Sequence, residues 1–130
     1  MIALDGSALF AVILDEPMAE RCDQALRAAG TELIMSSASL TETLIVAAGK
    51  NLYDEMQAFI AALQPTIIPL TEPRARAAAD AYRRWGKNFH PARLNLGDSF
   101  AYALAMEHAC PLLFVGNDFA QTDVVSALAG

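Results

Sequence analysis

Short apolar segments alternate with segments of helical periodicity along this chain, and that alternation restricts the possible folds more than any other feature. Strand-like apolar runs occur at residues 2–4, 33–35, 66–68 and 112–115. Such an alternation predicts a parallel sheet covered by helices on both faces, with a ligand site beyond the carboxyl ends of the strands. Because 130 residues suit one core, we expect a single three-layer α/β domain over residues 1–130, with a central sheet of four to five strands flanked by helices.

The segments between the apolar runs have the spacing of three and four residues that is typical of amphipathic helices. Pro17 and Pro65 each interrupt this spacing, and no internal repeat or low-complexity linker is present. We expect helices at residues 8–14, 18–29, 39–48, 52–63, 72–85 and 99–109, and a loop at residues 86–97.

Charge is distributed unevenly along the chain. Nine Lys and Arg against 15 Asp and Glu give a net charge of −6, which excludes binding of nucleic acid by overall positive charge. Residues 74–93 nevertheless carry +5 and hold one acid, Asp80, which leaves −11 on the remainder. The six basic residues of this segment are Arg74, Arg76, Arg83, Arg84, Lys87 and Arg93.

Composition also bounds the class of protein. Apolar residues make up 55% of the chain, too many for a disordered protein. Cys22 and Cys110 match no metal or redox spacing, so we expect free thiols in a reducing compartment. The longest wholly apolar run, residues 8–14, falls well short of a bilayer span. We therefore expect a cytoplasmic protein with no membrane partner.

Four acidic residues occupy positions that are unusual for acids of a solvated surface. Asp5 directly follows the first predicted strand, and Asp118 lies just past the last one. Glu42 lies in the first turn of a predicted helix, and Asp98 opens another. Several of these ends converge in a parallel sheet, and crowded carboxylates repel one another unless a cation neutralises them. Hard oxygen ligands of this kind suit Mg²⁺ or Mn²⁺.

Three of the four acids also have a purely structural interpretation. Ser39 and Glu42 have the S-x-x-E spacing of a capping box. Asp98 suits the N-cap of the helix that follows it, and Asp118 suits an ordinary turn. Asp5 is harder to explain in this way, so the functional interpretation depends on the set of four.

Four segments together resemble the PIN-domain ribonucleases, and most closely the VapC-type toxins of bacterial toxin–antitoxin pairs. They are MIALDGSAL at residues 1–9, SASLTE at 37–42, LNLGDSFAYALA at 94–105 and PLLFVGNDF at 111–119. The resemblance covers nearly the whole chain in order, and residues 86–105 are its most specific part. It implies a PIN-like fold over the full length.

The resemblance also assigns roles to particular side chains. It makes Asp5, Glu42, Asp98 and Asp118 the acidic site, with Asp5 and Asp98 as direct ligands of Mg²⁺, for which Mn²⁺ can substitute. Ser7 and Ser99 would lie beside this site, and Asp123 is a fifth acid that can assist it. One departure is Gly6, where the family more often has a residue with a side chain.

The implied activity is that of a Mg²⁺-dependent endoribonuclease that cuts tRNA, rRNA or mRNA and inhibits translation until a cognate antitoxin binds it. The resemblance also implies a homodimer. Arg83, Arg84, Lys87 and Arg93 are candidates for binding the RNA backbone, and a solvated helix face is the alternative. Trp85 and Phe89 are candidates for stacking on bases, with packing as the alternative.

Other classes of protein also have acidic residues at the ends of parallel strands. A catalytically silent PIN-like module would bind RNA without cutting it. An aspartyl-phosphate phosphatase requires a second aspartate where Ser7 stands. A receiver module requires a lysine after a late strand, and neither Lys50 nor Lys87 is placed there.

Overall fold

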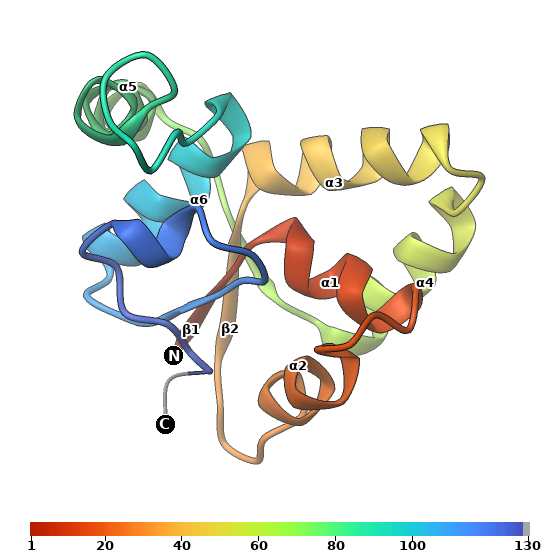
Figure 1. Cartoon of the computed structure of the whole chain (residues 1–130). Helices are drawn as coiled ribbons and strands as arrows, with labels where there is room; N and C mark the ends of the chain where they lie inside the picture. The colour runs from red at the N-terminus through yellow and green to blue at the C-terminus, as the bar shows by residue number, and fades with distance from the viewer. Residues whose placement is uncertain (129–130) are drawn as a thin grey trace.

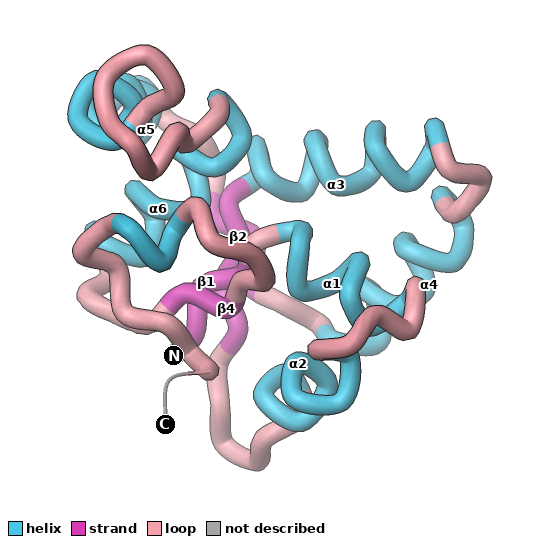
Figure 2. The backbone as a smooth tube through the Cα atoms, viewed as in Figure 1, coloured by secondary structure: helices cyan, strands magenta, loops and turns pink. Residues whose placement is uncertain are grey.

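The computed structural model describes residues 1–128, and a parallel sheet lies at its centre. Within those residues the sheet has four strands in the order β3-β2-β1-β4, as Figure 2 shows in part. Strand β1 is Ile2–Leu4, β2 is Leu33–Ser36, β3 is Thr66–Ile68 and β4 is Leu112–Leu113. Since β1 pairs with both β2 and β4, its carboxyl end is central in the sheet.

Helices cover both faces of the sheet, as the α/β alternation predicts (Figure 1). The described α-helices are α1 (Gly6–Ile13), α2 (Ala19–Leu26), α3 (Ser37–Gly49), α4 (Tyr53–Leu63), α5 (Glu72–Trp85) and α6 (Leu96–Glu107). A 3-10 helix, η1 (Phe119–Gln121), follows β4. None of the helices in residues 1–128 is long and apolar enough to cross a membrane.

Alternate residues of the strands belong to two separate cores. Ala3, Ile34 and Leu112 pack with α5 and α6 on one face. Leu4 and Met35 belong to the other core, to which α1, α2, α3 and α4 contribute side chains. Because successive strand side chains point to opposite faces, continuous apolar runs are the expected sequence of strands buried on both sides. The three-layer α/β architecture is thus confirmed.

Several element boundaries differ from the sequence predictions. Helix α3 begins at Ser37, directly after β2, because the Ser36 side chain caps it. Helix α6 begins at Leu96 because Asn95 is its N-cap. Strand β4 is two residues long, although the apolar run continues through Val115. In the two helices a capping side chain, which apolar periodicity does not register, decides where the helix begins.

Candidate active site

The four predicted acids converge near the carboxyl end of the sheet. The carboxyl of Asp98 is close enough to Asp5, Asp118 and Glu42 for all three charges to raise its pKa. The negative charge of Asp118 likewise raises the pKa of Asp5. The negative charge of Asp5 raises the pKa of Glu42. The structure therefore brings together carboxylates from four segments that are far apart in the sequence.

Asp5 is buried directly after β1 and is the N-cap of α1. Its Oδ2 accepts a hydrogen bond from the Ser7 amide at 3.1 Å. Burial raises the pKa of Asp5, hydrogen bonds from Ser7 and Gly6 oppose that rise, and repulsion from Asp118 adds to it. The predicted supporting residue Ser7 also accepts from the Val115 amide at 3.0 Å, so it joins Asp5 to the segment after β4.

Asp98 is the third residue of α6 rather than its N-cap, so the N-cap interpretation of Asp98 is wrong. Asn95 is the cap, and its Oδ1 accepts from the Asp98 amide at 2.8 Å. The Asn95 amide donates back to Asp98 Oδ2 at 3.0 Å, which completes a capping box. Burial is the main cause that raises the pKa of Asp98 to about 6, and the neighbouring carboxylates contribute.

Glu42 belongs to the second turn of α3, so its interpretation as part of a capping box with Ser39 is wrong. The cap is Ser36, whose Oγ accepts from the Ala38 amide at 3.2 Å. The Glu42 carboxylate instead lies against Gly97, in the space that a Cβ at residue 97 would fill. Burial, followed by repulsion from Asp5, raises the pKa of Glu42.

Asp118 lies in the turn between β4 and η1, as the turn interpretation expects. It occupies the N-cap position of η1, but its side chain makes no capping hydrogen bond. The turn needs Gly116, whose φ of 113° falls in the region that favours glycine. Asp118 is exposed, and its charge reaches both Asp5 and Asp98.

The two remaining candidates, Ser99 and Asp123, have contacts of their own. Ser99 is buried, and its hydroxyl donates to the Asn95 carbonyl at 3.1 Å, within the first turn of α6. Asp123 accepts a hydrogen bond from the Tyr102 hydroxyl and pairs with Arg84 at 3.7 Å. The charge of Asp123 is not among those that raise the pKa of Asp5, Glu42 or Asp98. The structure therefore does not join Asp123 to the four acids.

Sequence analysis missed two residues that shape the site, Asn95 and Gly97. Asn95 holds the backbone of the turn that carries Asp98. Gly97 leaves room for the carboxylate of Glu42. Their positions three residues and one residue before Asp98 were a signal, because a cap residue and a glycine at a helix start have specific structural uses.

The predicted cationic residues lie on α5 and on the loop after it. Arg83 is 3.8 Å from Asp80, and Arg84 lies 4.6 Å above the Trp85 ring. Lys87 and Arg93 belong to the loop between α5 and α6. Neither of these two has an ion-pair partner within residues 1–128.

The aromatic and histidine side chains of this region divide into buried and exposed groups. Trp85 is buried and donates to the Tyr102 hydroxyl at 2.9 Å, so the packing interpretation holds for it. His90 packs edge-on against Trp85, and its Nδ1 accepts from a backbone amide. Phe89, in contrast, is 60% exposed, so its ring is accessible to a ligand.

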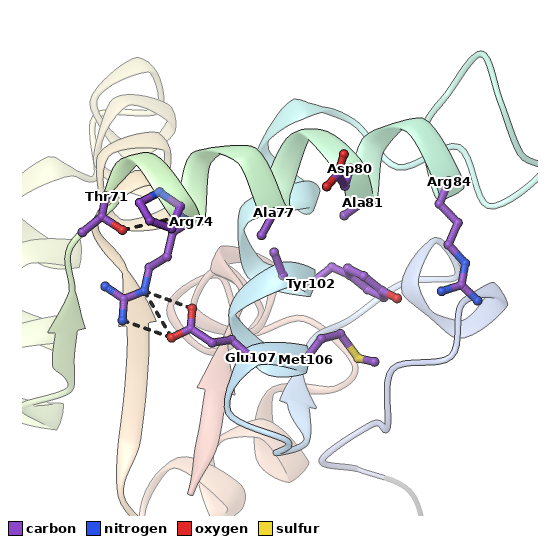
Figure 3. Close-up of a pocket in the computed structure, with 11 residues that line it drawn as sticks. Thr71, Arg74, Ala77, Asp80, Ala81, Arg84, Tyr102, Met106 and Glu107 are labelled. Atoms are coloured by element: carbon purple, nitrogen blue, oxygen red, sulfur yellow. Dashed lines mark hydrogen bonds and ion pairs between the residues drawn. The ribbon is translucent and has the colours of Figure 1, made fainter.

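Two grooves lie near these elements. One, of about 790 Å³, runs between α5 and α6 and is bounded by the Arg74–Glu107 ion pair (Figure 3). The other, of about 360 Å³, is lined by Glu42, Gly97 and Leu96 among others. The smaller groove therefore adjoins the acidic site.

The acidic site lacks a neutralising group from the described chain. None of Asp5, Glu42, Asp98 or Asp118 has an ion-pair partner in residues 1–128. Over the same residues, no three His, Cys, Asp or Glu side chains are arranged so that they hold a metal ion by themselves. The site is thus a group of oxygen donors with uncompensated negative charge.

Comparisons with known proteins agree with this fold and site. The family model of the PIN domain matches residues 2–125. Ribonuclease VapC30 of Mycobacterium tuberculosis is 36% identical over 127 residues, covering 96% of this chain and 97% of that protein. Ribonuclease VapC of Mycolicibacterium smegmatis is 40% identical over 128 residues, covering 96% and 98%.

Solved structures show the same architecture. Mycobacterium tuberculosis VapC20, described as a sarcin-ricin loop cleaving toxin, aligns with a TM-score of 0.77 at 14% identity, over 96% of this chain and 97% of that one. A toxin-antitoxin complex from Klebsiella pneumoniae aligns with a TM-score of 0.72 at 18% identity, over 99% and 98%. The chain therefore belongs to the PIN domain family. Within that family it is a VapC-type ribonuclease, as the sequence resemblance implies.

Proposed function

We propose that residues 1–130 of this VapC-type ribonuclease form one nuclease domain that cuts RNA internally with the help of Mg²⁺, or of Mn²⁺ in its place. The observation that carries the proposal is the convergence of Asp5, Glu42, Asp98 and Asp118 without a cation from the described chain. The raised pKa values of Asp5, Glu42 and Asp98 are typical of a site whose natural occupant is a cation.

The chemistry of the donors fits a hard divalent cation. Asp5 and Asp98 are the proposed ligands, because both are fixed by backbone hydrogen bonds and each experiences other carboxylates of the set. Mg²⁺ in proteins is commonly held by one or two carboxylates, with waters completing its shell. When bound, the ion supplies an activated water and offsets charge on the phosphoryl oxygens.

The chain's own side chains position this chemistry. The capping box fixes the backbone around Asp98, and Ser7 holds both Asp5 and the Val115 amide. Above a pH of about 6 the Asp98 carboxyl is mostly ionised and able to bind a cation. Glu42 adds negative charge from α3, in the space beside Gly97.

The loop between α5 and α6 is the proposed contact with the RNA backbone. Lys87 and Arg93 lie in this loop, with the exposed Phe89 between them in sequence. Cations bind phosphates and an accessible aromatic ring stacks on unpaired bases. Arg83 and Arg84 extend the basic surface along α5, although each also faces an acid of its own chain.

A cognate antitoxin is the proposed partner, and a homodimer is the proposed state. Ile45 and Leu96 are 67% and 69% exposed, and both line the groove beside Glu42. Exposed apolar residues next to a site commonly mark a protein interface. The apolar runs at residues 8–14 and 44–48 are the proposed surface for an antitoxin segment. Ala8, Leu9 and Ala11 of the first run are buried in the core, whereas Ile45 and Val46 of the second are exposed. We place the protein in the cytoplasm, where RNA substrates are available.

Cleavage of a panel of tRNA, rRNA and mRNA fragments by antitoxin-free protein tests this proposal. We expect cutting in Mg²⁺ or Mn²⁺, none in EDTA, and at least about a hundredfold less with Asp98→Asn. Equal cutting by the wild-type and Asp98→Asn proteins would refute the assignment of the site. RNA binding that is unaffected by chelator, with no cleavage, would favour a catalytically silent PIN-like module that binds RNA.

A further inference from the structure

The segment that carries Asp118 is held before and after that residue by contacts with Ser7 and with the apolar core. Before Asp118, the Val115 amide donates to Ser7 Oγ at 3.0 Å. After it, the Phe119 ring is buried with its centroid 5.2 Å from that of Phe114. These contacts hold the chain on either side of the turn in which Asp118 lies.

A side-chain network holds the same segment further along the chain, at Asp123. The buried Tyr102 of α6 donates its hydroxyl hydrogen to Asp123 Oδ1, five residues after Asp118. The same hydroxyl oxygen accepts from Trp85 Nε1 at 2.9 Å. Arg84 lies 3.7 Å from the second oxygen of Asp123, and Figure 3 shows Tyr102 extending from α6 toward the side on which Arg84 lies.

Two residues on one face of α6 therefore interact with two positions of one segment, one through charge and the other through a hydrogen bond. Asp98 and Tyr102 are four residues apart, which places their side chains on the same face of a helix. Asp98 experiences the charge of Asp118, and Tyr102 binds Asp123. Trp85 and Tyr102 are buried, whereas Arg84 and Asp123 are exposed, so the Tyr102 hydroxyl ties an exposed side chain of the segment to the buried side of α6. A hydrogen bond from a buried, packed donor restricts the segment more than the exposed ion pair with Arg84 does.

We propose that Tyr102 and Asp123 are positioning residues whose hydrogen bond fixes the segment carrying Asp118 against α6, so that Asp118 contributes its charge to the metal site. The inference rests on the proposed function, because it assigns Asp118 a role toward the cation. It also gives Asp123 a role that differs from that of a fifth acid in the site. Neither residue touches substrate or ion; both act through Asp118.

A double-mutant cycle on Mn²⁺ affinity tests this role. Calorimetry measures Mn²⁺ binding by wild-type protein, Tyr102→Phe, Asp118→Asn and the double variant, with Tyr53→Phe on α4 as a matched loss of one hydroxyl elsewhere. We expect Tyr102→Phe to weaken Mn²⁺ binding about tenfold in the wild-type background and by less than about twofold in the Asp118→Asn background. Asp123→Ala should match Tyr102→Phe, whereas Asp123→Asn keeps an acceptor oxygen and should retain most of the affinity.

The outcomes separate this inference from the proposed function. Equal weakening by Tyr102→Phe in both backgrounds would assign Tyr102 a merely structural role and overturn the inference. No weakening in the wild-type background would also overturn it, while Mn²⁺ binding that Asp98→Asn abolishes would leave the proposed function intact. Wild-type protein that binds no Mn²⁺ would refute both.

Discussion

The carboxylate of Glu42, on α3, lies against the backbone of Gly97, at the start of α6. A Cβ at residue 97 would overlap the carboxylate oxygens, so the absence of a side chain there lets Glu42 occupy the space. The backbone of Gly97 is helical and needs no glycine for its conformation. Its use is therefore spatial, and it couples the position of one acid to the helix that carries another.

Replacing this glycine tests that relationship. Gly97→Ala should lower RNA cleavage at least about tenfold, because the new methyl group displaces the Glu42 carboxylate. The fold should survive, since alanine favours the helix by about 1 kcal/mol over glycine. Gly49→Ala, at the end of α3 with nothing near its added methyl group, is the matched control and should cleave normally. Normal cleavage by Gly97→Ala would contradict the spatial role.

The pKa of Asp98 makes the stability of the metal-free protein depend on pH. Its folded-state pKa is about 6 and its unfolded value is 3.8, so the folded chain holds the proton more tightly between these values. Stability should therefore fall as pH rises through this interval, because the unfolded chain binds fewer protons there. Asp5 and Glu42, whose pKa values are also raised, contribute with the same sign.

Thermal melting in EDTA across this interval provides the measurement. The melting temperature of Asp98→Asn should fall less steeply with rising pH than that of the wild-type protein. The asparagine retains an oxygen that can accept from the Asn95 amide, so the helix start is preserved. Parallel pH curves for the two proteins would show that Asp98 does not titrate as described.

The exposed ring of Phe89 should contribute to binding of RNA. Because the ring is 60% exposed, Phe89→Ala should leave the melting temperature nearly unchanged. Loss of one stacked base should raise KM about fivefold or more without a matching loss of kcat, since base stacking is worth about 1–3 kcal/mol. Steady-state kinetics at saturating metal measure both constants. Val125→Ala, an exposed apolar residue after η1, is the control. A change confined to kcat would exclude a stacking role.

The buried hydroxyl of Ser39 on α3 tests how an unpartnered polar group affects the stability of the protein. This hydroxyl has no hydrogen-bond partner in residues 1–128. Ser39→Ala should therefore raise the free energy of unfolding by about 1 kcal/mol, as removal of an unsatisfied buried hydroxyl does. Ser36→Ala should lower it by about 1 kcal/mol, because Ser36 caps α3. Urea denaturation measures both changes, and a destabilised Ser39→Ala protein would reveal an unrecognised partner for that hydroxyl.

Sequence analysis predicted the sheet correctly because strands buried on both faces, such as β1 and β2, leave continuous apolar runs. It also predicted that the four acids lie near one another, as they do in the structure, because the ends of parallel strands meet at one edge of the sheet. It misplaced the starts of α3 and α6, where Ser36 and Asn95 compete with neighbouring polar residues for the cap position. Periodicity cannot decide between two polar residues that are a few positions apart.

Contacts between distant segments were beyond sequence reasoning for a different reason. Nothing in the local pattern of Gly97 indicates that Glu42, 55 residues earlier, needs the space beside it. The hydrogen bond from Tyr102 to Asp123 likewise joins α6 to the segment after η1. Such pairs follow from packing in three dimensions, which a single sequence does not encode in any local signal.

The most direct test of the central claim, that the four acids form one cation-dependent centre, is the melting temperature with and without Mn²⁺. In EDTA, Asp98→Asn should melt above the wild-type protein, because one repelling charge is gone. Mn²⁺ at about a hundred times its Kd should raise the wild-type melting temperature by roughly 10 °C, and that of Asp98→Asn far less. Glu55→Gln, on α4, is the control and should respond as the wild-type protein does. Equal gains with Mn²⁺ in wild-type and Asp98→Asn proteins would contradict the account.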